Sequence, residues 1–113
     1  GQRGSMWSSG RHTGLDFAAP QGRPVRSVSP GVVTRAGWDG PYGKSVTVRY
    51  GRYEYLYAHL SAIAVEKGQR VAARARLGKV GSTGNSTGPH LHLEVRKAGN
   101  RINPAVHLWG RRR

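Results

Sequence analysis

Apolar and polar residues alternate most strictly at residues 90–95, where the sequence is His-Leu-His-Leu-Glu-Val. Side chains two positions apart on a β-strand point to the same face and lie roughly 6 to 7 Å apart. A strand that begins at His90 is therefore predicted to present His90, His92 and Glu94 on one face and to pack its two leucines and its valine into a core. The Gly/Ser/Thr-rich loop over 80–88 is expected to form one wall of a cleft beside this strand.

Shorter runs of the same kind predict further strands joined by turns. Residues 25–28 and 32–34 flank a Ser-Pro-Gly turn. Residues 45–50 alternate valines with polar residues, and a second run over 53–59 follows the Gly-Arg pair after it. This pattern predicts a β-hairpin with His59 at a strand end.

The remaining segments are predicted to be mostly irregular. Residues 1–11 and 37–43 are rich in glycine and polar residues, and we expect loops there. Residues 63–77 are expected to hold a further short strand and turn, and 72–76 could instead form a helical turn. Near the C-terminus, residues 103–109 begin Asn-Pro before an apolar run, which predicts a short capped helix.

Length and glycine content support one mainly β domain over residues 1–113, a compact antiparallel sheet with little helix. A chain of 113 residues is long enough for one core and too short for two domains. Its 17 glycines and 6 prolines show no period, which suits many short strands joined by tight turns. No apolar stretch approaches about 18 residues, so we expect no transmembrane segment, and the N-terminus lacks the pattern of a secretory signal.

The chain contains no cysteine, so disulfides and thiolate metal sites are excluded. His, Asp and Glu are then the remaining strong metal ligands. His12 and Asp16 lie four positions apart on either side of Gly14. In a straight strand these two side chains would be about 13 Å apart, too far for one metal ion, but a bend at the glycine could bring them together. The two residues are candidate ligands, although the spacing alone is a weak pattern.

Histidine placement points to a metal site with proton-transfer groups beside it. His90 and His92 can share one metal ion, or one can bind it while the other handles protons, and the spacing leaves both possibilities open. His59 is a further candidate, with an ordinary surface histidine as the alternative. A catalytic zinc site needs three protein ligands and an open position for water. The helical His-Glu-x-x-His pattern of other zinc peptidases is absent.

The chain is strongly basic, with 19 Lys and Arg against 5 Asp and Glu and a formal net charge of +14. Such a charge attracts polyanions at long range, whether nucleic acid or an acidic cell-wall polymer. The arginines are spread from Arg3 to the terminal run 111–113, so a generally solvated basic surface explains them equally well. No recognised nucleic-acid-binding motif is present, and we expect no specific nucleic-acid partner.

Three motifs, in order, resemble the lysostaphin-like zinc metallopeptidases, the LytM-type endopeptidases of bacterial peptidoglycan. They are Gly-Arg-His-Thr-Gly-Leu-Asp-Phe at 10–17, Tyr-Ala-His-Leu-Ser at 57–61, and the segment 81–95 with its Gly-Pro-His-Leu-His-Leu-Glu-Val ending. The resemblance implies a compact antiparallel β-fold with an open substrate groove. The residues that it implies are His12, Asp16 and His92 as ligands of Zn²⁺, and His59 and His90 in the catalytic positions.

The implied function is hydrolysis of peptide bonds in peptidoglycan stem peptides or cross-bridges by a zinc endopeptidase. The zinc would bind the attacking water and polarise the scissile carbonyl. One of His59 and His90 would deprotonate the water and the other would stabilise the oxyanion, with the two roles open between them. Glu94, on the same strand face, is expected to orient a ligand histidine. Where relatives commonly have glycine this chain has Arg74, so we expect the turn there to be built differently.

The resemblance also implies where the protein acts. We expect a secreted or cell-wall-associated, bacteriolytic hydrolase that works as a monomer on bacterial peptidoglycan, with anionic wall polymers drawn to its basic surface. The alternative is a non-catalytic wall-binding or hydrolase-activating module with a structural zinc site.

Overall fold

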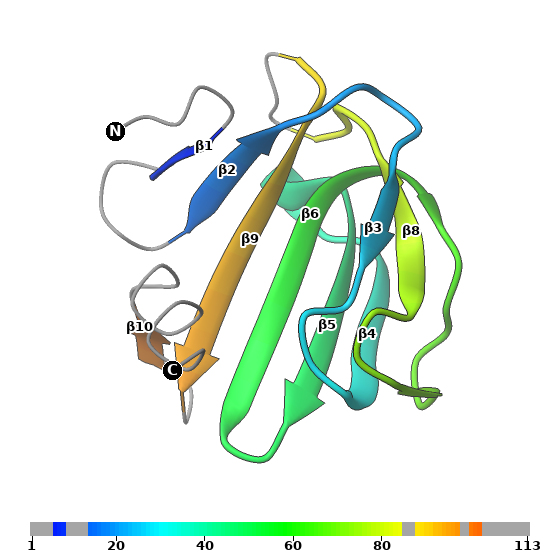
Figure 1. The fold of residues 1–113 in the computed structure, drawn as a ribbon, viewed down its shortest axis with the longest axis vertical. Helices are drawn as coiled ribbons and strands as arrows, with labels where there is room; N and C mark the ends of the chain where they lie inside the picture. Colours follow the sequence, from blue (N-terminus) through cyan, green and yellow to red (C-terminus); the bar gives the residue numbers. More distant parts are fainter. Residues whose placement is uncertain (1–5, 9–13, 85–87, 98–99, 103–113) are drawn as a thin grey trace.

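The computed structural model describes residues 6–8, 14–84, 88–97 and 100–102 of the chain (Figure 1). Its strands are β1 (Met6–Ser8), β2 (Leu15–Ala18), β3 (Pro24–Arg26), β4 (Gly31–Trp38), β5 (Lys44–Tyr50), β6 (Tyr53–Ile63), β7 (Arg70–Val71), β8 (Arg76–Val80), β9 (His90–Lys97) and β10 (Asn100–Ile102). The helical content of the described residues is one 3₁₀ turn, η1 (Gly40–Tyr42). No helix in this part of the chain is long and apolar enough to cross a membrane.

All the described strands join one antiparallel sheet, which confirms the predicted mainly β class. The main path runs β1-β2-β9-β6-β5-β4-β7, with β10 beside β9. Figure 1 shows the long strand β6 beside β9 over its first half, while β3 and β8 lie to one side. The second half of β6 pairs with β8 and β8 pairs with β3, so β6 changes neighbour along its length.

The predicted hairpin is present as β5 and β6. Tyr50 pairs with Tyr53, and the connection is the Gly51-Arg52 pair. Gly51 has a φ of 62°, in the left-handed region that two-residue hairpin turns require. The valines of β5 are completely buried, as the alternation predicts.

The core lies between the main sheet and the β3–β8 pair. It includes Val33, Val46 and Val48 of β4 and β5, Tyr55 and Tyr57 of β6, Leu77 of β8, and Leu93 and Val95 of β9. The Tyr57 hydroxyl accepts a hydrogen bond of 2.9 Å from the Val28 N–H, which ties the segment after β3 to β6. Burial raises the pKa of Tyr57 to about 12, so this hydroxyl stays neutral. Each fully buried Leu or Val contributes roughly 1.5–3 kcal/mol, so this core dominates the stability of the fold.

Several local predictions were wrong. The predicted N-terminal loop contains β1, which pairs with β2, because backbone pairing at a sheet edge does not need an alternating sequence. Strand β4 runs on to Trp38, into the segment predicted as a loop. The short strand and turn predicted within 63–77 are present as β7 and residues 72–75, Arg76 begins β8, and the alternative helical turn is absent there. The predicted helix at 103–109 lies outside the described residues.

Arg74 stands in this turn with a φ of 73°, a backbone conformation that glycine adopts without strain. Its N–H donates to the Ser27 carbonyl at 2.7 Å, and its carbonyl accepts from the Arg26 guanidinium at 3.2 Å. Arg74 thus adopts a glycine-like backbone conformation that these two hydrogen bonds hold, and a turn built differently from that of relatives stays a prediction.

Candidate active site

Strand β9 carries the polar face that the alternation predicts. Leu93 and Val95 are buried in the core, while His90, His92 and Glu94 occupy the opposite face. Strand β2 pairs with β9 so that Asp16 stands directly opposite His92. Directly opposed residues of neighbouring strands project to the same face. The sheet register thus brings together side chains that are 76 positions apart in the sequence.

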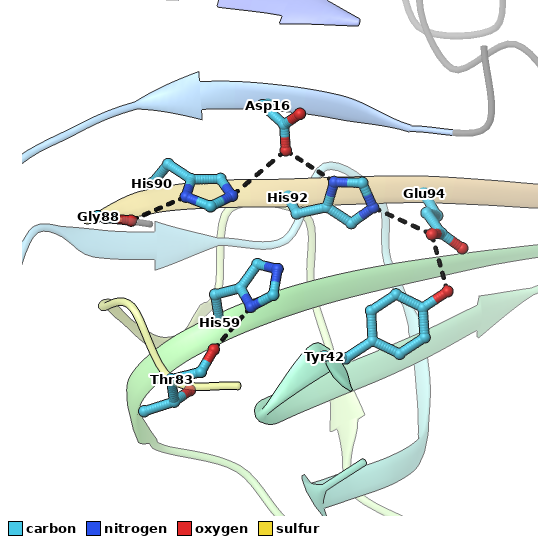
Figure 2. A network of polar contacts seen from close by, with 8 residues as sticks. All are labelled: Asp16, Tyr42, His59, Thr83, Gly88, His90, His92 and Glu94. Carbon is cyan, nitrogen blue, oxygen red and sulfur yellow. Dashed lines mark hydrogen bonds and ion pairs between the residues drawn. The ribbon is translucent and has the colours of Figure 1, made fainter. Parts of the chain in front are cut away.

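Asp16 lies between the two histidines of β9 (Figure 2). One of its carboxylate oxygens, Oδ1, is 2.7 Å from His92 Nδ1 and 3.4 Å from His90 Nε2. Asp16 is only 8% exposed. The other ring nitrogen of His90, Nδ1, donates to the Gly88 carbonyl at 2.9 Å. In a neutral His90 ring, Nε2 is therefore the acceptor.

Glu94 holds the far side of the His92 ring. His92 Nε2 lies 3.0 Å from Glu94 Oε2, and the Tyr42 hydroxyl donates to the same oxygen at 2.8 Å. Arg96 donates to the other oxygen, Oε1, at 3.3 Å. Figure 2 shows Glu94 and Tyr42 on the side of His92 away from Asp16. The predicted contact between Glu94 and a histidine is present, and the histidine is His92.

This arrangement determines what His92 can do. A neutral imidazole has one N–H, while both ring nitrogens of His92 face carboxylate oxygens, so donation to Glu94 would leave the Nδ1 lone pair directed at Asp16 Oδ1. Two acceptors at 2.7 Å require a cation between them, either a proton or a metal ion. Burial lowers the pKa of His92, but the hydrogen bonds to Glu94 and Asp16 outweigh it and raise the pKa above its usual value. A proton and a metal ion thus compete for the position between His92 Nδ1 and Asp16 Oδ1.

His59 reaches the site through a β-bulge. Tyr57 pairs with Val46 and Leu60 pairs with Lys44, so two residues of β6 stand opposite one residue of β5. Tyr57 and Leu60 both belong to the core, which means that the inward positions change from odd to even at His59. The bulge therefore turns His59 away from the core. Its prediction as a strand-end residue was wrong, because β6 continues to Ile63.

The His59 ring points toward the histidines of β9 (Figure 2), with ring centroids 4.9 Å from His90 and 5.9 Å from His92. Its backbone has a φ of 63°, unusual for a residue other than glycine and typical of functional sites. His59 Nδ1 donates to the Thr83 carbonyl at 2.7 Å, so Nε2 of the neutral ring is an acceptor. Burial lowers the pKa of His59, and the charges of the neighbouring imidazoles lower it further.

Thr83 connects the loop before β9 to both strands of the hairpin. Its hydroxyl donates to the Leu60 carbonyl at 2.7 Å and accepts from the Lys44 N–H at 3.0 Å. Gly43 packs so closely on this loop that a Cβ there would lie 2.4 Å from the Thr83 carbonyl carbon. The acceptor for His59 is consequently held by contacts on two sides.

The donor groups fit a zinc site, although the described residues contribute only part of it. A carboxylate and an imidazole nitrogen are ordinary zinc ligands, and the second nitrogen of a ligand histidine usually donates to a carboxylate, a place that Glu94 occupies beside His92 Nε2. Within the described residues, no three His, Asp or Glu side chains are arranged to hold a metal ion. The third predicted ligand, His12, lies outside them, and its role stays a prediction.

The structure thus brings Asp16, His59, His90 and His92 together on one face. Sequence reasoning missed Tyr42 and Thr83, whose partners are 52 and 24 positions away, so no local pattern indicated them. Gly14 was considered only as a bend. A Cβ at Gly14 would lie 2.5 Å from His92 Cε1, so this glycine also makes room for the ring.

Comparisons with known proteins agree on the family. The sequence profile of peptidase family M23 matches residues 10–104. DD-carboxypeptidase/endopeptidase Mpg of Neisseria meningitidis is 52% identical over 94 residues, 82% of this chain and 22% of Mpg. Glycyl-glycine endopeptidase ALE-1 of Staphylococcus capitis is 40% identical over 90 residues, 77% of this chain and 25% of ALE-1.

Among solved structures, the catalytic domain of the antimicrobial peptidase lysostaphin from Staphylococcus simulans has a TM-score of 0.83 at 33% identity. The match covers 87% of this chain and 79% of that domain. The chain spans less than a third of the length of the two curated relatives described above. The profile match over most of its residues, and its identity to these proteins, show that the chain belongs to peptidase family M23.

Proposed function

We propose that this chain is the catalytic domain of a zinc endopeptidase that hydrolyses peptide bonds in bacterial peptidoglycan. The observation that carries the proposal is the convergence of Asp16, His59, His90 and His92 on one sheet face, with His92 Nδ1 directed at Asp16 Oδ1. A purely structural metal site has no need of two further imidazoles with acceptor nitrogens beside it. This arrangement therefore favours catalysis over a non-catalytic binding or activating module.

The metal would be held by His12, Asp16 and His92. Bound Zn²⁺ supplies a Lewis acid for the scissile carbonyl and lowers the pKa of water toward about 7. The chain's own residues prepare this position. Glu94 takes the Nε2 proton of His92 and so presents the Nδ1 lone pair to the ion, and Tyr42 holds the Glu94 carboxylate in place.

We assign the general base to His59. Its Nδ1–H is engaged by the Thr83 carbonyl, which leaves Nε2 to accept a proton from water. Its lowered pKa keeps the ring unprotonated at neutral pH, as a base requires. His90 then takes the remaining role beside the oxyanion; because its Nδ1–H is engaged by the Gly88 carbonyl, its Nε2 on the Asp16 side stabilises the oxyanion when it carries a proton.

The relatives support the substrate class. Mpg is named a DD-carboxypeptidase/endopeptidase and ALE-1 a glycyl-glycine endopeptidase. The higher identity to Mpg favours stem-peptide bonds over glycyl-glycine bridges for this chain. Because the substrate is the cell wall, we place the protein outside the cytoplasm, secreted or wall-associated, as a monomeric and bacteriolytic hydrolase.

The test sorts single substitutions by their effects on metal and on turnover. His12→Ala, Asp16→Ala and His92→Ala are expected to lose zinc and activity together. His59→Ala and His90→Ala are expected to keep zinc and to lose turnover by about 10²-fold or more, the usual scale for an acid/base group. Metal analysis of each variant, with mass spectrometry of fragments released from defined walls, measures both effects.

Val28→Ala, a change at an exposed position away from the site, serves as the control and should keep both zinc and activity. Full activity after exhaustive chelation would contradict the proposal. Loss of zinc from His90→Ala with retention by His92→Ala would reverse the assignment of these two histidines.

A further inference from the structure

A polar hollow of about 330 Å³ lies on the sheet and is lined by none of the candidate active-site histidines. It is lined by Thr34, Arg35, Thr47, Glu54, Lys67 and Arg96. These residues come from the neighbouring strands β9, β6, β5 and β4 (Figure 1) and from the turn before β7, which is hydrogen-bonded to β4. Three of the lining side chains are cationic and one is acidic.

The hollow shares its sheet face with the candidate active site. Glu94 pairs with Leu56, Leu56 with Thr47, and Thr47 with Arg35. Directly paired residues project to one face, so this row runs from the hydrogen-bond partner of His92 into the hollow. Arg96 follows His92 by four positions on β9, a separation of about 13 Å along an extended strand. The hollow and the histidines therefore lie on the same face of the sheet, with the buried side chains of Glu94 and Leu56 between them.

The cations of the hollow are only partly neutralised by protein acids. The Arg35 guanidinium is 3.2 Å from Asp39, but its side chain is 63% exposed, so solvent weakens this pair. Arg96 donates to Glu94 at 3.3 Å, and its buried Nε has no hydrogen-bond partner among the described residues. Lys67 is exposed and forms no ion pair with a described residue closer than 4.0 Å. Lys67, and Arg35 through its solvent-weakened pair, are thus the cations of the hollow that an anion can reach.

We propose that this hollow binds a carboxylate of the peptide substrate, several residues from the bond that is cut. The inference rests on the proposed peptidase function and adds to it a preference for stem peptides with a free carboxylate. An extended peptide advances about 3.3 Å per residue, so the roughly 13 Å from His92 to Arg96 corresponds to about four residues. Arg35 and Lys67 provide the long-range attraction, and Arg96 links the hollow to Glu94.

The test compares two soluble stem peptides that differ only in one group, a free carboxylate in one and its amide in the other. For the wild-type protein we expect kcat/KM to favour the carboxylate roughly tenfold, about 1.4 kcal/mol, mainly through KM. The double variant Arg35→Gln/Lys67→Gln should lose most of this preference while its activity on the amide stays unchanged. Arg96 is left intact because it contacts Glu94.

The matched control is Arg52→Gln/Lys79→Gln, which removes the same two charge types at exposed positions outside the hollow. It should keep the wild-type preference. Dissociation constants of both peptides, measured with zinc-loaded His59→Ala protein and with the two double variants made in that background, test recognition without cleavage.

The outcomes separate the two proposals. If both peptides are cut and bound equally well by the wild-type protein, the carboxylate inference is wrong and the peptidase function stands. If neither peptide is cut, the proposed function fails, and the dissociation constants still decide whether the hollow selects the carboxylate. If Arg35→Gln/Lys67→Gln loses only sedimentation with whole walls, the hollow serves an anionic wall polymer and the inference is overturned.

Discussion

Glu94 is the residue through which His92 is oriented. It is 3% exposed and contacts the His92 ring, the Tyr42 hydroxyl and the Arg96 guanidinium. When the His92 proton is on Nε2, this charged acceptor holds it and the Nδ1 lone pair faces Asp16. Hydrogen bonds of this kind beside a metal ligand typically change metal affinity 10- to 100-fold.

Glu94→Gln is therefore expected to weaken zinc binding roughly 10- to 100-fold, because the amide lacks the charge that holds the His92 proton. Tyr42→Phe removes a single hydrogen bond to Glu94, and a loss of about fivefold is expected. Competition with a chromophoric chelator measures both. Tyr50→Phe, a change at an exposed tyrosine away from the site, should leave zinc affinity unaltered. Wild-type affinity in Glu94→Gln would show that Glu94 does not orient His92.

The lowered pKa of His59 makes a prediction about pH. Burial and the neighbouring imidazoles favour its neutral form, so the ring stays a base below its ordinary pKa of 6.5. With zinc in excess, the acid limb of kcat/KM should lie below pH 6.5, and bound zinc measured at each pH separates this loss from release of the metal. The unfolded chain binds this proton more readily, so the contribution of neutral His59 to stability is present above pH 6.5 and is lost as pH falls through the lowered value. If kcat/KM already falls above pH 6.5 while zinc is still bound, His59 is excluded as the base.

At the scale of elements, the site depends on how β2 approaches β9. Gly14 directly precedes β2, and a Cβ there would lie 2.5 Å from His92 Cε1 and 2.8 Å from Nε2. Gly14→Ala should thus push the ring from its contact with Glu94 and lower zinc affinity by at least about tenfold. Zinc titration and thermal unfolding of the variant measure the effects on site and fold.

Gly88→Ala is the control for this change, because a Cβ at Gly88 meets no atom of the described residues within 4 Å. It should retain zinc affinity. If Gly14→Ala bound zinc like the wild type, the ring would have room that the structure does not show, and the close approach would have no role in the site.

The β-bulge in β6 is the second feature of the strands on which the site depends. A regular strand would place His59 on the same face as Tyr55 and Tyr57, inside the core. The extra residue turns it to the opposite face, where the Thr83 carbonyl holds it. Bulges are common next to active sites because they redirect one side chain without ending the strand.

At the scale of the whole molecule, the net charge of +14 should act on walls rather than on the chemistry. At about 0.15 M salt the screening length is roughly 8 Å, so scattered arginines lose their long-range attraction while groups at contact distance keep theirs. Salt should weaken sedimentation with walls and leave cleavage of a short peptide without a free carboxylate nearly unchanged. Removing residues 111–113, which lie outside the described residues, should act in the same direction. Parallel losses on walls and on the neutral peptide would place the charge in catalysis.

The local pattern of the sequence was sufficient for the central features of the fold. Alternation identified β9 and its two faces, and the valines with the Gly51-Arg52 pair identified the β5–β6 hairpin, because both depend on the two-residue period of a strand. The absence of cysteine, the spacing of the histidines and three short motifs were sufficient to indicate the family and the candidate site. The N-terminal strand β1 was missed because edge pairing uses backbone groups that every residue carries.

What only the tertiary structure decided are contacts between segments far apart in the chain. The register of β2 against β9 places Asp16 opposite His92, and the folded loops bring Tyr42 to Glu94 and Thr83 to His59. The bulge that redirects His59 depends on how β5 pairs with β6, since nothing in the run of 53–61 marks an extra residue. Sequence periodicity reports which face a side chain takes within its own strand, whereas its partner across the sheet is determined by packing of the whole core.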